Sequence, residues 1–123
     1  VAVGDVNGDG INEIVTAAGP GGGPHIRIFD YNGTLISQFF AYDKKFRGGV
    51  SVAVGDVNGD GINEIVTAAI LGGNSEIKIF NKKFEQIINF FTYEKNNNKA
   101  IYVSTNDIDK DGVFEILVST KNF

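Results

Sequence analysis

The sequence contains one stretch, Val1–Ala18 (VAVGDVNGDGINEIVTAA), that recurs without a single change as Val52–Ala69. The two segments stay aligned without a gap beyond this stretch, and 28 of 51 positions agree. A third, weaker copy covers residues 103–123, and its first aspartate, Asp107, lies 51 residues after Asp56. A fixed period of this length is the signature of a repeat architecture. We therefore predict three repeats, at residues 1–51, 52–102 and 103–123.

Each repeat has the pattern of short β-strands. His25–Phe29 and Glu76–Phe80 alternate between polar and apolar residues with period two. Asn32-Gly33 predicts a two-residue hairpin turn, and Gly19–Pro24 excludes a helix. No stretch of ten or more residues shows helical periodicity. We therefore predict an all-β fold of four-stranded antiparallel units, with strands at Val1–Gly4, Glu13–Ala18, His25–Phe29 and Leu35–Ala41 and their counterparts in the second repeat, which include Gln86–Thr92.

A four-stranded unit cannot bury both of its faces alone, so repeated units of about 51 residues suggest the stacked blades of a β-propeller. The chain would hold about 2.4 blades, whereas a closed propeller needs about four to eight. We therefore expect a fragment of a larger propeller. Its neighbouring blades would come from the rest of a longer chain or from other copies of this one.

The composition excludes several classes of protein. The 123 residues include no Cys, which rules out disulfides, thiol catalysis and zinc–thiolate sites. A single histidine, His25, makes a Ser-His-Asp triad a poor candidate. No apolar run approaches the roughly 18–20 residues that span a bilayer. The sequence begins at Val1, inside an apolar stretch, so no targeting signal informs the localisation.

The acidic residues are concentrated in three places. Ten of the fifteen fall within Asp5–Glu13, Asp56–Glu64 and Asp107–Glu115, and the formal net charge is −4. The basic residues are scattered and form no stripe of the kind that binds nucleic acid. The charge pattern thus predicts three local cation sites rather than a diffusely acidic surface.

Each acidic cluster has the spacing of a calcium-binding loop. Oxygen-bearing side chains occupy loop positions 1, 3, 5 and 9, and glycine occupies position 6, where the chain must turn sharply. Calcium is favoured over Mg²⁺ because the loop offers many oxygen ligands without a strict octahedron. We predict three Ca²⁺ ions, with the carbonyl at position 7 as a further ligand. The predicted ligands are Asp5, Asn7, Asp9, Ile11 and Glu13; Asp56, Asn58, Asp60, Ile62 and Glu64; and Asp107, Asp109, Asp111, Val113 and Glu115.

The same residue types also occur in other kinds of loop. Asp, Asn and Gly also form plain turns between strands without any metal. An EF-hand or dockerin loop requires an acid at position 12 and an adjoining helix, but Thr16 stands there and Gly19-Pro20 follows. Kelch propellers share the Gly-Gly pair, yet a Trp is expected later in each blade and this chain has none.

The stretch Gly4–Val15, with an apolar strand on each side, resembles the FG-GAP or VCBS repeat, which builds the integrin-α-type β-propeller. The resemblance covers essentially the whole chain and implies calcium ligands at the positions named above. It also implies an extracellular or cell-surface location. The family more often has Asp where this chain has Glu13, Glu64 and Glu115. Because no clear Phe-Gly…Gly-Ala-Pro signature is present, the bacterial VCBS-like branch fits better than the integrin branch.

These observations predict a non-catalytic, calcium-stabilised scaffold for adhesion or for binding carbohydrate or protein ligands. The alternatives are a propeller domain of a secreted polysaccharide-degrading enzyme and a purely structural spacer in a surface protein. Ligand sites tend to lie on loops at one end of a rigid scaffold. The end opposite the acidic loops carries Gly19–Pro24, Tyr42–Gly49, Leu71–Ser75 and Glu94–Lys99, which read either as a ligand site or as plain connections. Tyr42, Phe46 and Arg47 would suit a sugar ring or an anionic polymer.

Overall fold

The computed structural model describes residues 1–92 and 99–122. These residues form ten β-strands, all paired antiparallel, and no helix, so none of them provides a helix that could span a membrane. The all-β prediction is confirmed. The strands are β1 (Ala2–Gly4), β2 (Glu13–Thr16), β3 (His25–Phe29), β4 (Leu35–Phe40), β5 (Val50–Gly55), β6 (Glu64–Ala69), β7 (Glu76–Phe80), β8 (Gln86–Phe91), β9 (Lys99–Asn106) and β10 (Glu115–Asn122).

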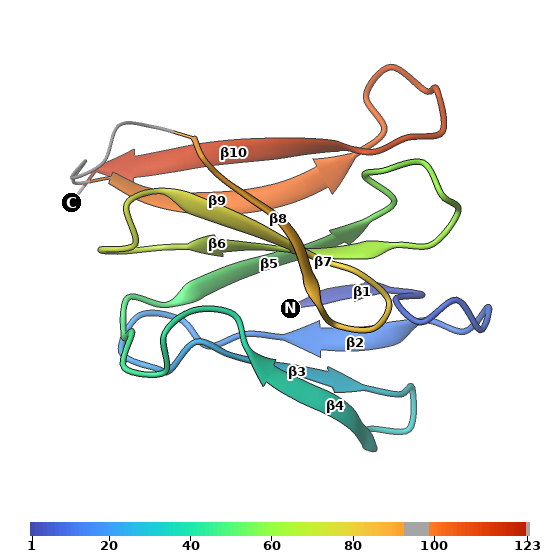
Figure 1. Ribbon diagram of the computed structural model, residues 1–123, viewed down its shortest axis with the longest axis horizontal. Helices are drawn as coiled ribbons and strands as arrows, with labels where there is room; N and C mark the ends of the chain where they lie inside the picture. Colours follow the sequence, from blue (N-terminus) through green and yellow to red (C-terminus); the bar gives the residue numbers. More distant parts are fainter. Residues whose placement is uncertain (93–98, 123) are drawn as a thin grey trace.

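The strands form three sheets that stack in chain order (Figure 1). The sheet β1-β2-β3-β4 is called blade 1, the sheet β5-β6-β7-β8 blade 2, and the pair β9-β10 the third unit. Strand β5 contacts both β1 and β9, so the first strands of the three sheets are neighbours. No sheet closes on itself within the described residues. The arrangement is that of consecutive propeller blades, present as a fragment.

Two apolar cores lie between the sheets. In a strand, alternate side chains point to opposite faces, so a central sheet can bury both faces. Blade 2 does so, and all six residues of β6 are buried. The first core joins blade 1 to blade 2 through Val15, Ile26, Ile28, Ile65 and Phe80. The second joins blade 2 to the third unit through Val66, Ala68, Ile77, Ile79, Ile101 and Val103.

The connection from β4 to β5 runs between the two blades. The amide of Val50 donates to the carbonyl of Ala18 in blade 1 (2.9 Å), and the amide of Ile70 in blade 2 donates to the carbonyl of Gly49 (2.9 Å). A side chain on Gly48 would overlap the carbonyl oxygen of Leu71. Backbone hydrogen bonds and a glycine contact therefore fix the spacing of the blades at this end.

The turn between β3 and β4 is longer than the two-residue hairpin that Asn32-Gly33 predicts. The connection covers residues 30–34, and the amide of Asp30 donates to the carbonyl of Thr34 (2.9 Å). This hydrogen bond closes a three-residue loop, residues 31–33. Gly33 adopts a left-handed conformation (φ 85°), and the pairing register shifts between Ile28 and Phe29. A left-handed glycine followed by a bulge is the usual geometry of the three-residue hairpin loop.

Candidate metal centres

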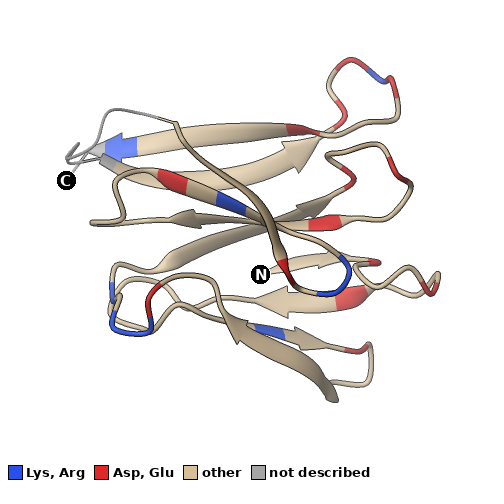
Figure 2. Cartoon of the chain, viewed as in Figure 1, with Lys and Arg blue, Asp and Glu red and all other residues tan. Residues whose placement is uncertain are grey.

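The three acidic loops lie at the same end of the stack (Figure 2). Each joins the first two strands of a sheet: residues 5–12 link β1 to β2, residues 56–63 link β5 to β6, and residues 107–114 link β9 to β10. Because the strands are antiparallel, the β3–β4 and β7–β8 turns share this end. The Gly19–Pro24, Tyr42–Gly49 and Leu71–Ser75 loops lie at the other end, as the strand order predicts.

The first loop is organised around Asp5. Its Oδ1 accepts hydrogen bonds from the amides of Gly8 (2.8 Å) and Asp9 (3.2 Å), and its Oδ2 accepts one from Gly10 (2.8 Å). Asn7 Oδ1 accepts the amide of Asp9 (3.0 Å). Gly8 and Gly10 have φ of 84° and 86°, a left-handed conformation that other residues rarely adopt. The side chains thus hold the chain in a tight ring with the oxygens on its inner side.

The second loop repeats this geometry almost bond for bond. Asp56 accepts hydrogen bonds from the amides of Gly59 (2.8 Å), Asp60 (3.1 Å) and Gly61 (2.9 Å). Asn58 Oδ1 accepts the amide of Asp60 (3.1 Å). The two loops have the same sequence, and the repetition shows that this sequence specifies the ring independently of its place in the stack.

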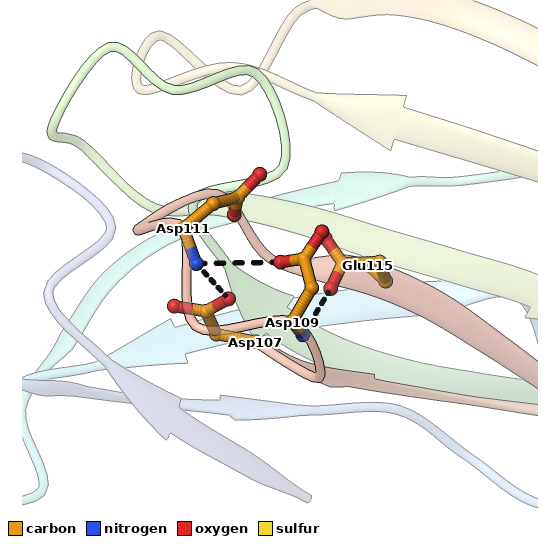
Figure 3. Close-up of side chains that lie close together, drawn as sticks. All are labelled: Asp107, Asp109, Asp111 and Glu115. Atoms are coloured by element: carbon orange, nitrogen blue, oxygen red, sulfur yellow. Dashed lines mark hydrogen bonds between the residues drawn. The ribbon is translucent and has the colours of Figure 1, made fainter.

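The third loop keeps the ring with different residues (Figure 3). The amide of Asp111 donates to Asp107 Oδ1 (3.1 Å) and to Asp109 Oδ1 (3.3 Å). Lys110 stands where the other loops have glycine and adopts a left-handed conformation (φ 60°). Asp109 replaces the asparagine of the other loops, so four carboxylates converge here instead of three.

The glutamate at position 9 begins the second strand of each sheet and points back into the loop. Glu13 Oε2 accepts the amide of Val6 (2.9 Å), Glu64 Oε1 that of Val57 (3.0 Å), and Glu115 Oε1 that of Ile108 (2.9 Å). Glu13 and Glu64 are only 2% and 1% exposed, because the adjacent blade covers them, whereas Glu115 at the end of the stack is partly exposed. The donor at loop position 2 is a backbone amide, so the Val and Ile side chains at that position gave no indication of this hydrogen bond in the sequence.

Burial makes these carboxylates costly to ionise. Burial raises the pKa of Glu64 to about 7, and the negative charges of Asp60 and Asp56 raise it further. The hydrogen bond from the amide of Val57 acts in the opposite direction but is outweighed. The pKa of Glu13 is raised for the same reasons. The pKa of Asp5 is lowered instead. Burial is the largest single effect and raises this pKa, but the hydrogen bonds from the amides of Gly10, Gly8 and Asp9 together outweigh it. A cation within each ring would offset the repulsion among these groups.

The carboxylates of each loop converge closely enough to share one ion. One carboxylate oxygen from each member lies within 4.8 Å of the others in three groups: Asp5, Asp9 and Glu13; Asp56, Asp60 and Glu64; and Asp107, Asp109, Asp111 and Glu115. All the donors are oxygens, which suits a hard cation such as Ca²⁺. The fit extends to the predicted carboxylates. Direct ligation by Asn7 and Asn58, and by the carbonyls of Ile11, Ile62 and Val113, stays a prediction.

A pocket of about 410 Å³ adjoins the second loop. Asp60, Ile62 and Glu64 line one side, and the β7–β8 turn lines the other with Asn81, Lys82, Lys83 and Glu85. In the first repeat Tyr31 and Asn32 occupy the positions of the two lysines. Sequence reasoning did not single out these lysines, because they lie about 20 residues from the loop they face.

At the opposite end, the residues considered for ligand binding have structural contacts. Tyr42 is buried and its hydroxyl donates to the carbonyl of Glu76 (2.9 Å), and the Phe46 ring lies 5.7 Å from the Tyr42 ring. Arg47 donates to the carbonyls of Lys44 (2.7 Å) and Phe46 (2.9 Å). Tyr42 and Phe46 therefore belong to the contact between blades. Residues 94–98 of the fourth loop at this end lie outside the described residues.

The sequence matches the family of FG-GAP-like repeats over residues 5–67, which is just over half of the chain. The matched region contains the first two acidic loops, strands β2 to β5 and most of β6. Together with the stacked four-stranded sheets, this match shows that the chain belongs to the FG-GAP-like repeat family and is built as a propeller-like scaffold. No curated protein gives a significant match.

Proposed function

We propose that this chain is part of a calcium-stabilised, extracellular β-propeller scaffold that serves adhesion or the binding of a carbohydrate or protein ligand, and that it is not catalytic. The observation that supports the calcium role most strongly is the threefold repetition of one ring. In each ring the first aspartate accepts loop amides, the glutamate accepts the position-2 amide, and the carboxylates converge within 4.8 Å.

The proposed ions have a structural role. Each would bind between the first two strands of a sheet, beside a glutamate that also touches the inter-sheet region. Metal binding to such a site contributes its free energy to folding, because the unfolded chain does not assemble the ligands. The ions would therefore stabilise both the hairpins and the stacking of the blades.

Calorimetric titration of Ca²⁺ into the metal-free chain tests this role. We expect three binding events in the unaltered chain and two in Asp56→Asn, which removes the central carboxylate of the second ring. Asp43→Asn is the matched control, because it removes one exposed acid outside the rings. Absence of Ca²⁺ binding, or equal loss in both variants, would refute the calcium role.

The adhesive or ligand-binding role and the extracellular location are inferred from membership of the FG-GAP-like family. The non-catalytic role is inferred because the candidate residues named above form no catalytic constellation. The bacterial VCBS-like branch is proposed because the Phe-Gly…Gly-Ala-Pro signature is missing from the sequence. A glycan array probed in calcium distinguishes a lectin-like scaffold from a spacer, since a spacer would retain no glycan. Loss of viscosity in a polysaccharide solution would instead identify the enzyme alternative.

A further inference from the structure

The pocket beside the second ring lies between acidic residues of that ring and a turn that carries two lysines. Its volume of about 410 Å³ falls within the range, roughly 300–1,000 Å³, of pockets that hold small ligands. The ring contributes Asp60 and Glu64, and the β7–β8 turn contributes Lys82 and Lys83. In the part of the chain that the structure describes, both lysine side chains are exposed and neither makes a hydrogen bond or an ion pair. Their ammonium groups are therefore available to a ligand in the pocket.

The β7–β8 turn has a shape that its own hydrogen bonds fix. Asn81 Oδ1 accepts the amides of Lys83 (2.9 Å) and Glu85 (3.1 Å), and the amide of Phe84 donates to the carbonyl of Asn81 (2.8 Å). Phe84 also packs against the first core. Because Oδ1 of Asn81 is used within the turn, its NH₂ group is the part of the side chain that can donate to a ligand. This wall of the pocket is thus formed without any ligand.

Blade 1 provides an internal comparison, because its β3–β4 turn has the same hydrogen bonds. Asp30 Oδ1 accepts the amides of Asn32 and Thr34 (2.9 Å each). The side chains of the two turns differ, with Asp30, Tyr31 and Asn32 in the places of Asn81, Lys82 and Lys83. The first ring, which has the same sequence as the second, is therefore accompanied by an acid and by no base. Of the two blades, only blade 2 combines a ring with basic side chains on its turn.

Calcium in the ring determines the charge that the pocket presents. In blade 2, one Ca²⁺ and two lysines balance the four acids of the ring and the turn, which are Asp56, Asp60, Glu64 and Glu85. In blade 1, Ca²⁺ alone faces the four corresponding acids, which are Asp5, Asp9, Glu13 and Asp30, and two negative charges remain. Because an uncompensated negative charge repels an anion, only the blade 2 site suits a negatively charged group.

The lining of the pocket suits a ligand that carries both a carboxylate and hydroxyl groups. The two ammonium groups and the Asn81 amide can donate hydrogen bonds to a carboxylate. The carboxylates of Asp60 and Glu85 can accept hydrogen bonds from hydroxyls. A neutral sugar would leave the lysines unused, and an acidic peptide side chain would offer no hydroxyl. A uronic acid carries both groups on one ring.

We propose that the pocket between the second ring and the β7–β8 turn binds a uronic acid residue of an acidic saccharide, with Lys82 and Lys83 as its carboxylate-binding residues. This inference rests on the proposed calcium role, because the ion offsets the negative charge of Asp60 and Glu64 beside the ligand. It puts the ligand at the end of the stack that carries the rings, whereas the sequence directed attention to the loops of the opposite end.

Calorimetric titration of a galacturonate trimer into the Ca²⁺-saturated chain tests this site. We expect one binding site, and a loss of affinity of at least about tenfold in the double variant Lys82→Tyr, Lys83→Asn. This variant receives the residues of the blade 1 turn, which forms the same hydrogen bonds, so the fold should persist, and circular dichroism checks this. The matched control is Lys44→Tyr, Lys45→Asn, which makes the same change of charge on an exposed loop at the opposite end and should keep the affinity.

Two comparison ligands separate the two parts of the proposed chemistry. A neutral galactose trimer lacks the carboxylate and a glutamate tripeptide lacks the hydroxyls, so each should bind at least about tenfold more weakly than the galacturonate trimer. Removal of Ca²⁺ by EDTA should weaken the galacturonate trimer by a similar factor. Equal binding of either comparison ligand, or unchanged binding in EDTA or in the Lys82→Tyr, Lys83→Asn variant, would overturn the proposal.

The calcium titration described above keeps this test separate from that of the proposed function. A chain that binds three Ca²⁺ ions but no galacturonate would overturn this inference alone. A chain that binds no Ca²⁺ would refute the calcium role and this inference with it.

Discussion

The backbone amide of Val57 donates a 3.0 Å hydrogen bond to Oε1 of Glu64, which ties the second residue of the acidic loop to the first residue of β6. Glu64 is 1% exposed, so this bond holds a carboxylate inside the protein beside two aspartates. A buried carboxylate of this kind requires either a proton or a nearby cation. The predictions on metal and pH follow from that requirement.

Removal of calcium should lower the stability of the chain. A ligand that binds only the folded state at 100 times its Kd stabilises by about 2.7 kcal/mol per site. We expect EDTA to lower the Tm by several degrees, and Ca²⁺ to restore it more effectively than Mg²⁺ at equal concentration. Differential scanning calorimetry measures both effects. An unchanged Tm in EDTA would contradict a structural role for the ions.

Without metal, stability should fall as the pH rises. The pKa of Glu64 is about 7 in the folded chain and 4.5 in an unperturbed glutamate, so the folded state holds this proton more tightly. Its contribution to stability is complete below about pH 4.5 and is lost as the pH rises through 7. Urea denaturation in EDTA at pH 5 and pH 8 should show this loss. Glu64→Gln should reduce it and the exposed-site control Glu85→Gln should not; equal slopes in both variants would contradict the assignment.

The third loop should bind divalent ions differently from the other two, because Asp109 supplies a fourth carboxylate where they have asparagine. Asp109→Asn gives this loop the same donors as the first loop. We expect it to weaken binding at this site by about tenfold, with little effect on the other two. Calorimetric titration resolves the change. The reverse substitution, Asn58→Asp, should strengthen the second site. Tighter binding in Asp109→Asn or weaker binding in Asn58→Asp would contradict the role of charge.

The Phe84 side chain should stabilise the fold even though this residue adopts a strained, left-handed backbone conformation. It has φ 61° where the first repeat has Gly33, and its ring lies 6.1 Å from the Phe39 ring of blade 1 in a stacked arrangement. Phe84→Ala removes the ring and keeps the strained backbone conformation. Phe84→Gly removes the ring and also relieves the strain, because glycine adopts a positive φ readily. We expect both variants to be less stable than the unaltered chain, with Phe84→Gly about 1 kcal/mol more stable than Phe84→Ala. Urea denaturation measures the difference.

Gly33→Ala is the control for the backbone effect, because a Cβ there meets nothing within 4 Å. It should be destabilising by the conformational cost alone. If Phe84→Ala were as stable as the unaltered chain, the aromatic contact between the blades would contribute nothing.

Much of the site could be predicted because its parts lie close together in the sequence. Asp5, Asp9 and Glu13 fall within nine residues, and the glycines between them permit the left-handed conformations that a tight ring requires. The spacing thus indicated both the ring and the chemistry of its donors. The burial of Glu13 and Glu64 was not predictable in this way, since it arises from the sheet stacked beside each loop. The lysines facing the second loop were missed because the fold of blade 2 brings the β7–β8 turn beside a loop that is distant in the sequence.

The local pattern of the sequence determined the repeat, the antiparallel strands and the three rings, because turns, alternation and ligand spacing act over a few residues. The tertiary structure decided which of those residues are buried and which are exposed. Val1–Ala18 and Val52–Ala69 are the same string of letters, yet Val3 is exposed and Val54 is packed. The difference lies in whether another sheet covers the face, and only the stacking of blades determines that. Gly55 permits such close stacking, because a Cβ there would lie 2.8 Å from Phe114 Cδ2 in the next sheet.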